Sequence, residues 1–231
     1  GIKAGFVKPF SQEPNAAADR TTALYRHLFS NETVEPISHA AVTRRLSHDE
    51  NDELLEDAVR LHREIAKKHD LIIVEGLVPT SRDAFASQLN ADLAKALDAK
   101  VLIVSTADIR NPAAAAEKIE TQLRHFGGAG NARTAGVLFM RTKGLPEGAA
   151  QVPVTLDPNL RLISDINSFT AELKKRNANI GADDFPVIGL VPFSDTLSVP
   201  RMSDLAAHIS AHWINEGEAK QRRVLHSSLI A

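Results

Sequence analysis

The sequence predicts an α/β domain with a mostly parallel sheet flanked by helices. Five short segments are nearly continuous apolar runs, which is typical of strands that are covered on both faces. Segments with helical periodicity lie between them, and such alternation predicts βαβ units with right-handed crossovers. The chain has 231 residues, 43% of them hydrophobic, so it is long enough to bury the core of one large domain.

The five predicted strands are short and consist mostly of apolar residues. They are Ala4–Lys8, Leu71–Glu75, Val101–Ser105, Ala135–Arg141 and Pro186–Val191. Open sheets of this class bind ligands at the carboxyl ends of their strands. The residues that close these segments are therefore the first candidates for a functional site.

Helical patterns connect the strands. The segment Ser47–Glu50 has the spacing of a capping box, which predicts a helix that begins there. Its apolar face is formed by residues spaced by three or four, namely Leu54, Ala58, Leu61 and Ile65. A second helix is marked by Phe85, Leu89 and Leu93.

Three further helices are expected downstream. Asn111 followed by Pro112 is typical of an N-cap and a first-turn proline, and Gly127-Gly128 should end that helix. Asn167 or Ser168 is expected to begin the next one, after a loop or insertion over 143–165. The last helix is marked by Leu205, Ile209 and Trp213. We expect the α/β domain to span residues 1–213, and residues 214–231 to be a linker and the start of a middle domain.

Composition excludes several classes of function. The net charge is −2, which gives no reason to expect nucleic acid or an anionic membrane as a partner. The apolar runs are too short to span a bilayer. The chain has no cysteine, which excludes disulfides and thiolate metal sites and favours a cytoplasmic location.

The first two predicted strands each end in a charged residue. Lys8 ends the first segment and Glu75 ends the second, where it is followed by Gly76. If these strands are adjacent, a cation and a carboxylate meet at one edge of the sheet. Such a pair suits a phosphate with its metal ion. The alternative is a structural ion pair.

Asp19 has two interpretations. It lies just before a helical pattern that begins in DRTTALYRH, so it could cap that helix. It could also be a second carboxylate for a metal ion. We take Lys8, Asp19, Glu75 and Gly76 as the candidate ligand-binding residues, with Asp19 and Glu75 as possible Mg²⁺ ligands, and we assign no catalytic residue.

Other motifs carry less chemistry. The turn with Gly127, Gly128 and Gly130 follows a helix and is interpreted as a C-cap. His208 and His212 have metal-ligand spacing, but no HExxH pattern accompanies them, so we interpret them as surface histidines. No GxxxxGK[ST] motif occurs in these 231 residues, and the chain is therefore expected to bind nucleotide poorly.

An ordered set of motifs resembles a known family. VKPF (7–10), DRTT (19–22), VEGLVPT (74–80), FGGAGN (126–131), PVIGLVP (186–192) and WINEGEAKQRRV (213–224) together resemble the N-terminal region of the long bacterial form of phosphate acetyltransferase. The first two motifs are shared with dethiobiotin synthetase. The resemblance covers nearly the whole chain.

The resemblance implies a fold and a role. The fold would be P-loop NTPase-like, of the dethiobiotin synthetase type, with the family's first strand and phosphate loop lying before the position of Gly1. Lys8 would face phosphate, and Asp19 and Glu75 would hold Mg²⁺. The chain would be a regulatory and assembly domain that does not itself transfer the acyl group. Its partners would be its own C-terminal catalytic domain, other copies in a homo-oligomer, and a small-molecule effector.

Two alternatives stay open. One is an ATP-dependent ligase of the dethiobiotin synthetase type, which would use Lys8, Asp19 and Glu75 together with a phosphate loop. The other is a module that organises oligomers and binds no ligand. Because the family's first strand would lie inside the sheet, we also expect this chain to be marginally stable without it.

Overall fold

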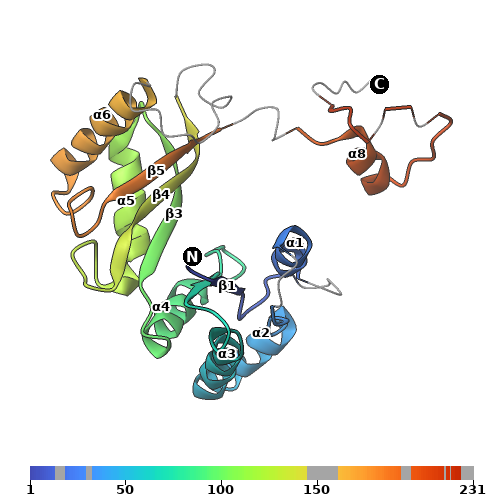
Figure 1. Ribbon diagram of the computed structural model, residues 1–231, viewed down its shortest axis with the longest axis horizontal. Coiled ribbons are helices and arrows are strands. Elements are labelled where there is room, and N and C mark those ends of the chain that lie inside the picture. The colour runs from blue at the N-terminus through green and yellow to red at the C-terminus, as the bar shows by residue number, and fades with distance from the viewer. Residues whose placement is uncertain are drawn as a thin grey trace. The chain divides into compact units, whose positions relative to one another are not determined.

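The computed structural model describes residues 1–13, 19–29, 33–144, 161–193, 199–215, 217–218 and 220–224 (Figure 1). Its elements in chain order are β1 (Ala4–Val7), α1 (Arg20–Phe29), α2 (His39–Ser47), α3 (Asn51–Ala66), β2 (Leu71–Val74), α4 (Ala86–Ala96), β3 (Val101–Asp108), α5 (Pro112–Leu123), the 3-10 helix η1 (Arg124–Phe126), β4 (Thr134–Lys143), α6 (Arg161–Arg176), β5 (Val187–Pro192) and α8 (Met202–His208). Among the described residues, none of these helices combines the length and apolar character needed to cross a membrane.

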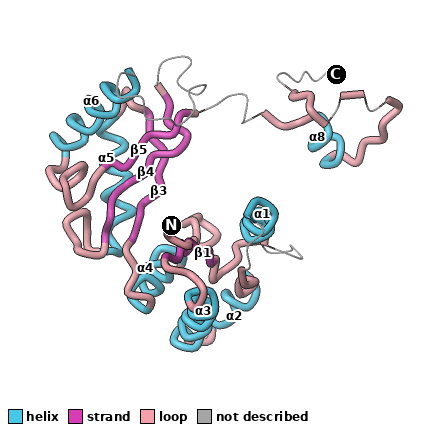
Figure 2. The backbone as a smooth tube through the Cα atoms, viewed as in Figure 1, coloured by secondary structure: helices cyan, strands magenta, loops and turns pink. Residues whose placement is uncertain are grey.

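The chain forms two compact units. The first consists of residues 1–101 and 120–135, and the second of residues 102–119 and 136–231. The strands form two sheets, β1-β2 and β3-β4-β5, and Figure 2 shows how helices accompany both of them. Each unit is described by itself below.

The first unit is built on the parallel pair β1-β2. Ala4 lies opposite Leu71 and Val7 opposite Val74, so both strands end at the same edge. The core beside this pair is formed by buried apolar residues of the helices and of the loop after β1. Its main members are Phe10, Val42, Leu54, Ala58, Leu77, Leu89 and Leu93. Burial of these side chains holds α2, α3 and α4 together.

The second unit contains the sheet β3-β4-β5. Strands β4 and β5 are parallel, with Val137 opposite Val187. Phe139 of β4 is fully buried and packs edge-on against Phe169 of α6, with ring centroids 5.4 Å apart. This geometry is favourable for aromatic pairs, and it anchors α6 to the sheet.

All five predicted strands are confirmed, with ends that differ by a few residues. The strand β3 is longer than expected, because it runs to Asp108. Asn111 caps α5 as predicted, since its side-chain oxygen accepts the N–H of Ala114 at 3.1 Å. Gly127 has φ +83° and follows η1, so the predicted glycine stop is confirmed as well.

The prediction of a capping box at Ser47–Glu50 is wrong. Ser47 is the last residue of α2, and its hydroxyl donates to the carbonyl of Arg44 at 2.6 Å. The helix α3 begins at Asn51, and its N-cap Glu50 makes no capping bond with its side chain. The prediction failed because Ser47 belongs to the end of α2, a helix that the sequence analysis did not identify.

Two helix boundaries also differ from the predictions. Helix α6 begins at Arg161, so the expected loop over 143–165 is wrong at its end and Asn167 and Ser168 lie inside the helix. Helix α8 ends at His208, before Ile209 and Trp213. Ser210 has φ +54°, a left-handed conformation that ends helices. The rest of the predicted loop, over 145–160, lies outside the described residues.

Candidate functional site

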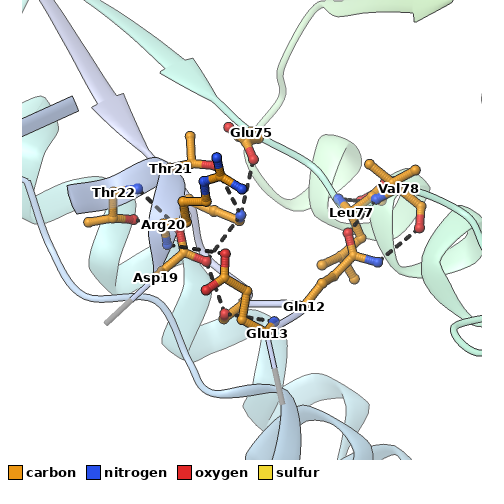
Figure 3. A network of polar contacts seen from close by, with 12 residues as sticks. Gln12, Glu13, Asp19, Arg20, Thr21, Thr22, Glu75, Leu77 and Val78 are labelled. Atoms are coloured by element: carbon orange, nitrogen blue, oxygen red, sulfur yellow. Dashed lines mark hydrogen bonds and ion pairs between the residues drawn. The ribbon is translucent and has the colours of Figure 1, made fainter. Parts of the chain in front are cut away.

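The site predicted at the ends of β1 and β2 is assembled in the structure. Lys8 follows β1 and is 6% exposed. Its Nζ lies 3.1 Å from Asp19 Oδ2 and 3.1 Å from Glu75 Oε1, and Figure 3 labels these two carboxylate residues. The strands are adjacent and parallel, and the N–H of Glu75 donates to the carbonyl of Val7. Backbone pairing therefore brings Lys8 and Glu75 together, and Asp19 reaches the same point from the start of α1.

Asp19 caps α1, as one of its two interpretations predicted, and it also forms an ion pair with Lys8. Its Oδ1 accepts the backbone N–H of Thr22 at 3.1 Å, as an N-cap of α1 does. Its Oδ2 accepts the hydroxyl of Ser11 at 2.9 Å and pairs with Lys8. The side chain is only 1% exposed, so all of its accepting capacity is directed to the protein.

The electrostatics of this cluster favour the charged forms. Burial alone would lower the pKa of Lys8, but its hydrogen bonds to Asp19 and Glu75 outweigh burial and raise that pKa above 10.5. Burial would also raise the pKa of Asp19, yet hydrogen bonds from Thr22, Lys8 and Ser11 hold it below 3.8. The buried ammonium is therefore charged and neutralised by its two neighbours.

Gly76 has a structural reason to be glycine. A Cβ at this position would meet Asn90 Oδ1 at 2.9 Å. The Asn90 amide holds the next residue at two points, because its oxygen accepts the N–H of Leu77 and its nitrogen donates to the Leu77 carbonyl, both at 2.8 Å. Gly76 thus makes room for the side chain that fixes the loop after Glu75.

A second side-chain amide holds the following residue in the same way. Gln12 Oε1 accepts the N–H of Val78 at 2.6 Å, and its Nε2 donates to the Val78 carbonyl at 2.9 Å. The same Nε2 lies 3.0 Å from Asp83 Oδ2. The other oxygen of Asp83 lies 2.9 Å from Nε2 of His39, the first residue of α2. These contacts connect the loops after β1 and β2 with α2.

Substituting Gly76 by alanine is expected to break the Asn90 clamp. Displacing the amide leaves the N–H and C=O of Leu77 without their partners, and we expect a loss of about 2 kcal/mol in the free energy of unfolding. Urea unfolding measures it. In an Asn90→Ala background the same substitution should cost much less, and equal costs in both backgrounds would contradict this role of Gly76.

The stability of the first unit is expected to fall in acid. Hydrogen bonding with His39 and Gln12 holds the pKa of Asp83 below 3.8 despite its burial, and the pKa of Asp19 is lowered too. Carboxylates with lowered folded pKa values stabilise the fold above their unfolded pKa, and this stability is lost as pH falls through the folded pKa. Urea midpoints measured from neutral pH to below pH 3.8 should drop, and less steeply in Asp83→Asn. An unchanged slope in that variant would refute the assignment.

The sequence analysis missed Gln12, His39, Asp83 and Asn90. Each is polar, and each partner lies far along the chain, for example 44 residues between His39 and Asp83. Asp83 is 4% exposed and the other three are half-buried, and no local pattern in the sequence reports this burial. Asp83 does follow the VEGLVPT motif closely, and this was the only available hint.

The oxygen-rich cluster has donors that suit Mg²⁺. Asp19 and Glu75 both face Lys8, however, and its ammonium already supplies the positive charge between them. Within the part of the chain that the structure describes, no group of three or more His, Cys, Asp or Glu side chains is arranged to hold a metal. A Mg²⁺ role for Asp19 and Glu75 stays a prediction, and we derive no step through the metal.

The histidine pair has no metal-site geometry. His208 is the last residue of α8, and His212 lies beyond the helix. Both are exposed, which agrees with surface histidines.

The parallel strands and the flanking helices define an α/β protein, and the family match makes it P-loop NTPase-like. A protein-family model described as "AAA domain" matches residues 1–201. The chain belongs to that family.

Three relatives of this chain carry the same name. "Phosphate acetyltransferase" of Acinetobacter baylyi is 60% identical over 231 residues, which cover all of this chain and 32% of that protein. The proteins of the same name from Pseudomonas aeruginosa and Nitrosomonas europaea are 33% and 30% identical, again over all of this chain and 31% of theirs. The chain thus spans about a third of its relatives' length, and the resemblance found from the motifs is confirmed: it corresponds to an N-terminal part of such proteins.

Proposed function

We propose that this chain is the N-terminal regulatory and assembly domain of a phosphate acetyltransferase, an enzyme that converts acetyl-CoA and phosphate to acetyl phosphate and CoA. The acyl-transfer site would lie elsewhere in the parent protein. The observation that supports this is the closure of the candidate site: Lys8 is bound by Asp19 and Glu75, and Asp19 also caps α1.

The site has the features of a structural network. A catalytic group needs access to a substrate and a pKa matched to its task. Lys8 is buried, and its pKa is raised by its partners, so it stays protonated and cannot act as a nucleophile or base near neutral pH. Glu75 is the more accessible member, with 36% of its side chain exposed, and it would be the point where an effector reaches the cluster.

The experiment compares the chain with its parent. We expect no turnover of acetyl-CoA by the purified 231-residue chain. A parent enzyme from which this region is deleted should keep acyl transfer but change its assembly state in size-exclusion chromatography and its response to metabolites. Acetyl-CoA turnover by the isolated chain would overturn the proposal, and so would a deletion that leaves both assembly and regulation unchanged.

An ATP-dependent ligase of the dethiobiotin synthetase type is the second candidate. The arrangement of Lys8, Asp19 and Glu75 at the carboxyl edge of β1 and β2 favours it. Titration of Mg-ATP into the chain by calorimetry discriminates the two candidates, since micromolar binding would support the ligase. A module that only organises oligomers is distinguished by assembly that changes on deletion while metabolite responses do not.

The partners follow from the same proposal. They are the catalytic domain of the parent, other copies of the chain and a small-molecule effector bound near Glu75. A cytoplasmic location also belongs to this proposal; the lack of cysteine favours it.

A further inference from the structure

A basic cluster lies at the carboxyl edge of the sheet β3-β4-β5, in the second compact unit. Arg110 follows β3, Arg141 and Lys143 are at the end of β4, and Phe193 follows β5. The guanidinium carbon of Arg141 lies 5.3 Å from the centroid of the Phe193 ring, and Lys143 Nζ lies 5.7 Å from it. Ligands of open α/β sheets bind at this edge.

The backbone is built to hold these groups in place. The N–H of Phe193 donates to the carbonyl of Thr142 at 2.9 Å, and the N–H of Ile109 donates to the carbonyl of Lys143 at 3.0 Å. The ends of the three strands are thereby tied to one another. The sheet therefore fixes the backbone positions from which the exposed side chains of Arg110, Arg141 and Lys143 extend.

Arg141 has an unusual conformation inside a strand. Its φ is +52°, in the left-handed region that non-glycine residues rarely adopt. Between Phe139 and Thr142, β4 advances by three residues while β5 advances by two, from Leu190 to Pro192. This is a bulge, and bulges near strand ends turn a side chain toward a site. Strain of this kind is concentrated at ligand sites.

Among the residues that the structure describes at this edge, Arg110, Arg141 and Lys143 outnumber the carboxylate of Asp108. Asp108, the last residue of β3, is held by Arg110, with 2.8 Å from Nε to Oδ1 and 2.6 Å from Nη2 to Oδ2. Bonding to Arg110, aided by the charge of Lys143, lowers the pKa of Asp108 to about 2. Asp108 is thus neutralised by Arg110, and Arg141 and Lys143 have Phe193 as their neighbour.

Gly144 permits this arrangement. Its φ is +81°, and a Cβ there would lie 2.9 Å from Asp108 Oδ1 and 3.2 Å from Arg110 Cγ. The chain that leaves β4 therefore passes directly against the Asp108–Arg110 pair, which brings Lys143 and Arg110 to the same edge.

We propose that Arg141, Lys143 and Arg110 form a binding site for a small phosphate-bearing anion with at least two negative charges, with Phe193 orienting the two cations of β4. Guanidinium groups bind phosphate oxygens at two points, and a lysine adds a point charge. The site lies outside the Lys8 cluster and does not depend on the proposed regulatory role.

Inorganic pyrophosphate is the probe for this site. Titration into the 231-residue chain by calorimetry, at an ionic strength held constant with sodium chloride, should show saturable binding. Arg141→Asn combined with Lys143→Met should weaken it about tenfold or more, since charge-assisted hydrogen bonds are lost; asparagine tolerates the left-handed backbone. Lys175→Met, which removes an exposed lysine of α6, is the matched control. It should bind pyrophosphate as tightly as the unsubstituted 231-residue chain does.

The substitution Asp108→Asn is expected to change the affinity for pyrophosphate in the opposite direction. The amide keeps an oxygen for the N–H of Arg110 but removes the negative charge, so pyrophosphate should bind about threefold more tightly or better. A structural role alone would not produce this gain. The proposal would be overturned if the unsubstituted 231-residue chain does not bind pyrophosphate, if the double variant binds it with equal affinity, or if Lys175→Met loses as much affinity as the double variant. If the double variant does not fold, unchanged or weaker binding by Asp108→Asn decides against it.

Discussion

Replacing Lys8 by methionine is expected to lower the free energy of unfolding by about 3 kcal/mol, because removing one member of a buried ion pair leaves its partners uncompensated. Asp19 is 1% exposed at its side chain and would lose the ammonium that stabilises its charge. Methionine keeps the volume and the apolar stem, so the loss reports charge more than packing. Urea unfolding at neutral pH, monitored by circular dichroism, measures it.

Two controls separate charge from general disturbance. Lys118→Met removes an exposed lysine that contacts Thr106 and should change stability by less than about 0.5 kcal/mol. The defect of Lys8→Met should shrink in acid, because without the ammonium the pKa of Asp19 rises and protonation removes the unpaired charge. A loss below about 1 kcal/mol at neutral pH would mean that the network contributes little beyond its desolvation cost.

The result also bears on function. If Lys8 is a structural residue, Lys8→Met should harm stability and leave assembly of the folded fraction unchanged. If an effector binds at the cluster, Glu75→Gln should alter the response of the parent to that effector at little cost in stability, since Glu75 is the more exposed partner.

The parts of this fold that the sequence predicts are those that depend on local pattern. Continuous apolar runs located all five strands, since strands buried on both faces have few polar residues. Strand ends then placed Lys8 and Glu75 at one edge, and the pairing of β1 with β2 brings them together. Asp19 was a candidate because it lies just before a helical pattern, and its side chain does cap α1.

The parts that it does not predict depend on distant partners. The Ser47–Glu50 spacing matches a capping box, but Ser47 is the last residue of α2. Spacing alone cannot show whether a residue ends one helix or begins the next. The clamps made by Gln12 and Asn90 join residues 66 and 13 positions apart. The bulge at Arg141 is set by register against β5, which no single strand encodes.

The second large effect concerns the edges of the sheets. Within the described residues, β2 ends one sheet and β3 ends the other. Both strands carry exposed apolar side chains, which are Leu71 and Ile73 at 52% and 57% and Leu102 and Val104 at 45% and 55%. Parallel strands are normally covered on both faces and paired at interior positions. Judged from the described residues, these strands therefore resemble interior strands of a larger sheet.

A version of the chain extended at its N-terminus by one further strand and helix of the parent is expected to melt about 5 °C higher. Covering the two half-exposed side chains of the strand that it joins would contribute on the order of 2 kcal/mol, and each kcal/mol raises the melting temperature of a domain this size by roughly 2–4 °C. Calorimetry compares the two chains. The added strand should also slow hydrogen exchange at amides of β2 or β3.

An extension of equal length with a scrambled sequence is the control. It adds the same mass but lacks the apolar pattern that pairs with a sheet, so its melting temperature should equal that of the 231-residue chain. Equal midpoints for the native and scrambled extensions would refute the expectation. In that case the exposed faces of β2 and β3 must be covered by another part of the parent or by a second copy, and the deletion experiment in the parent enzyme would then show the larger change in assembly.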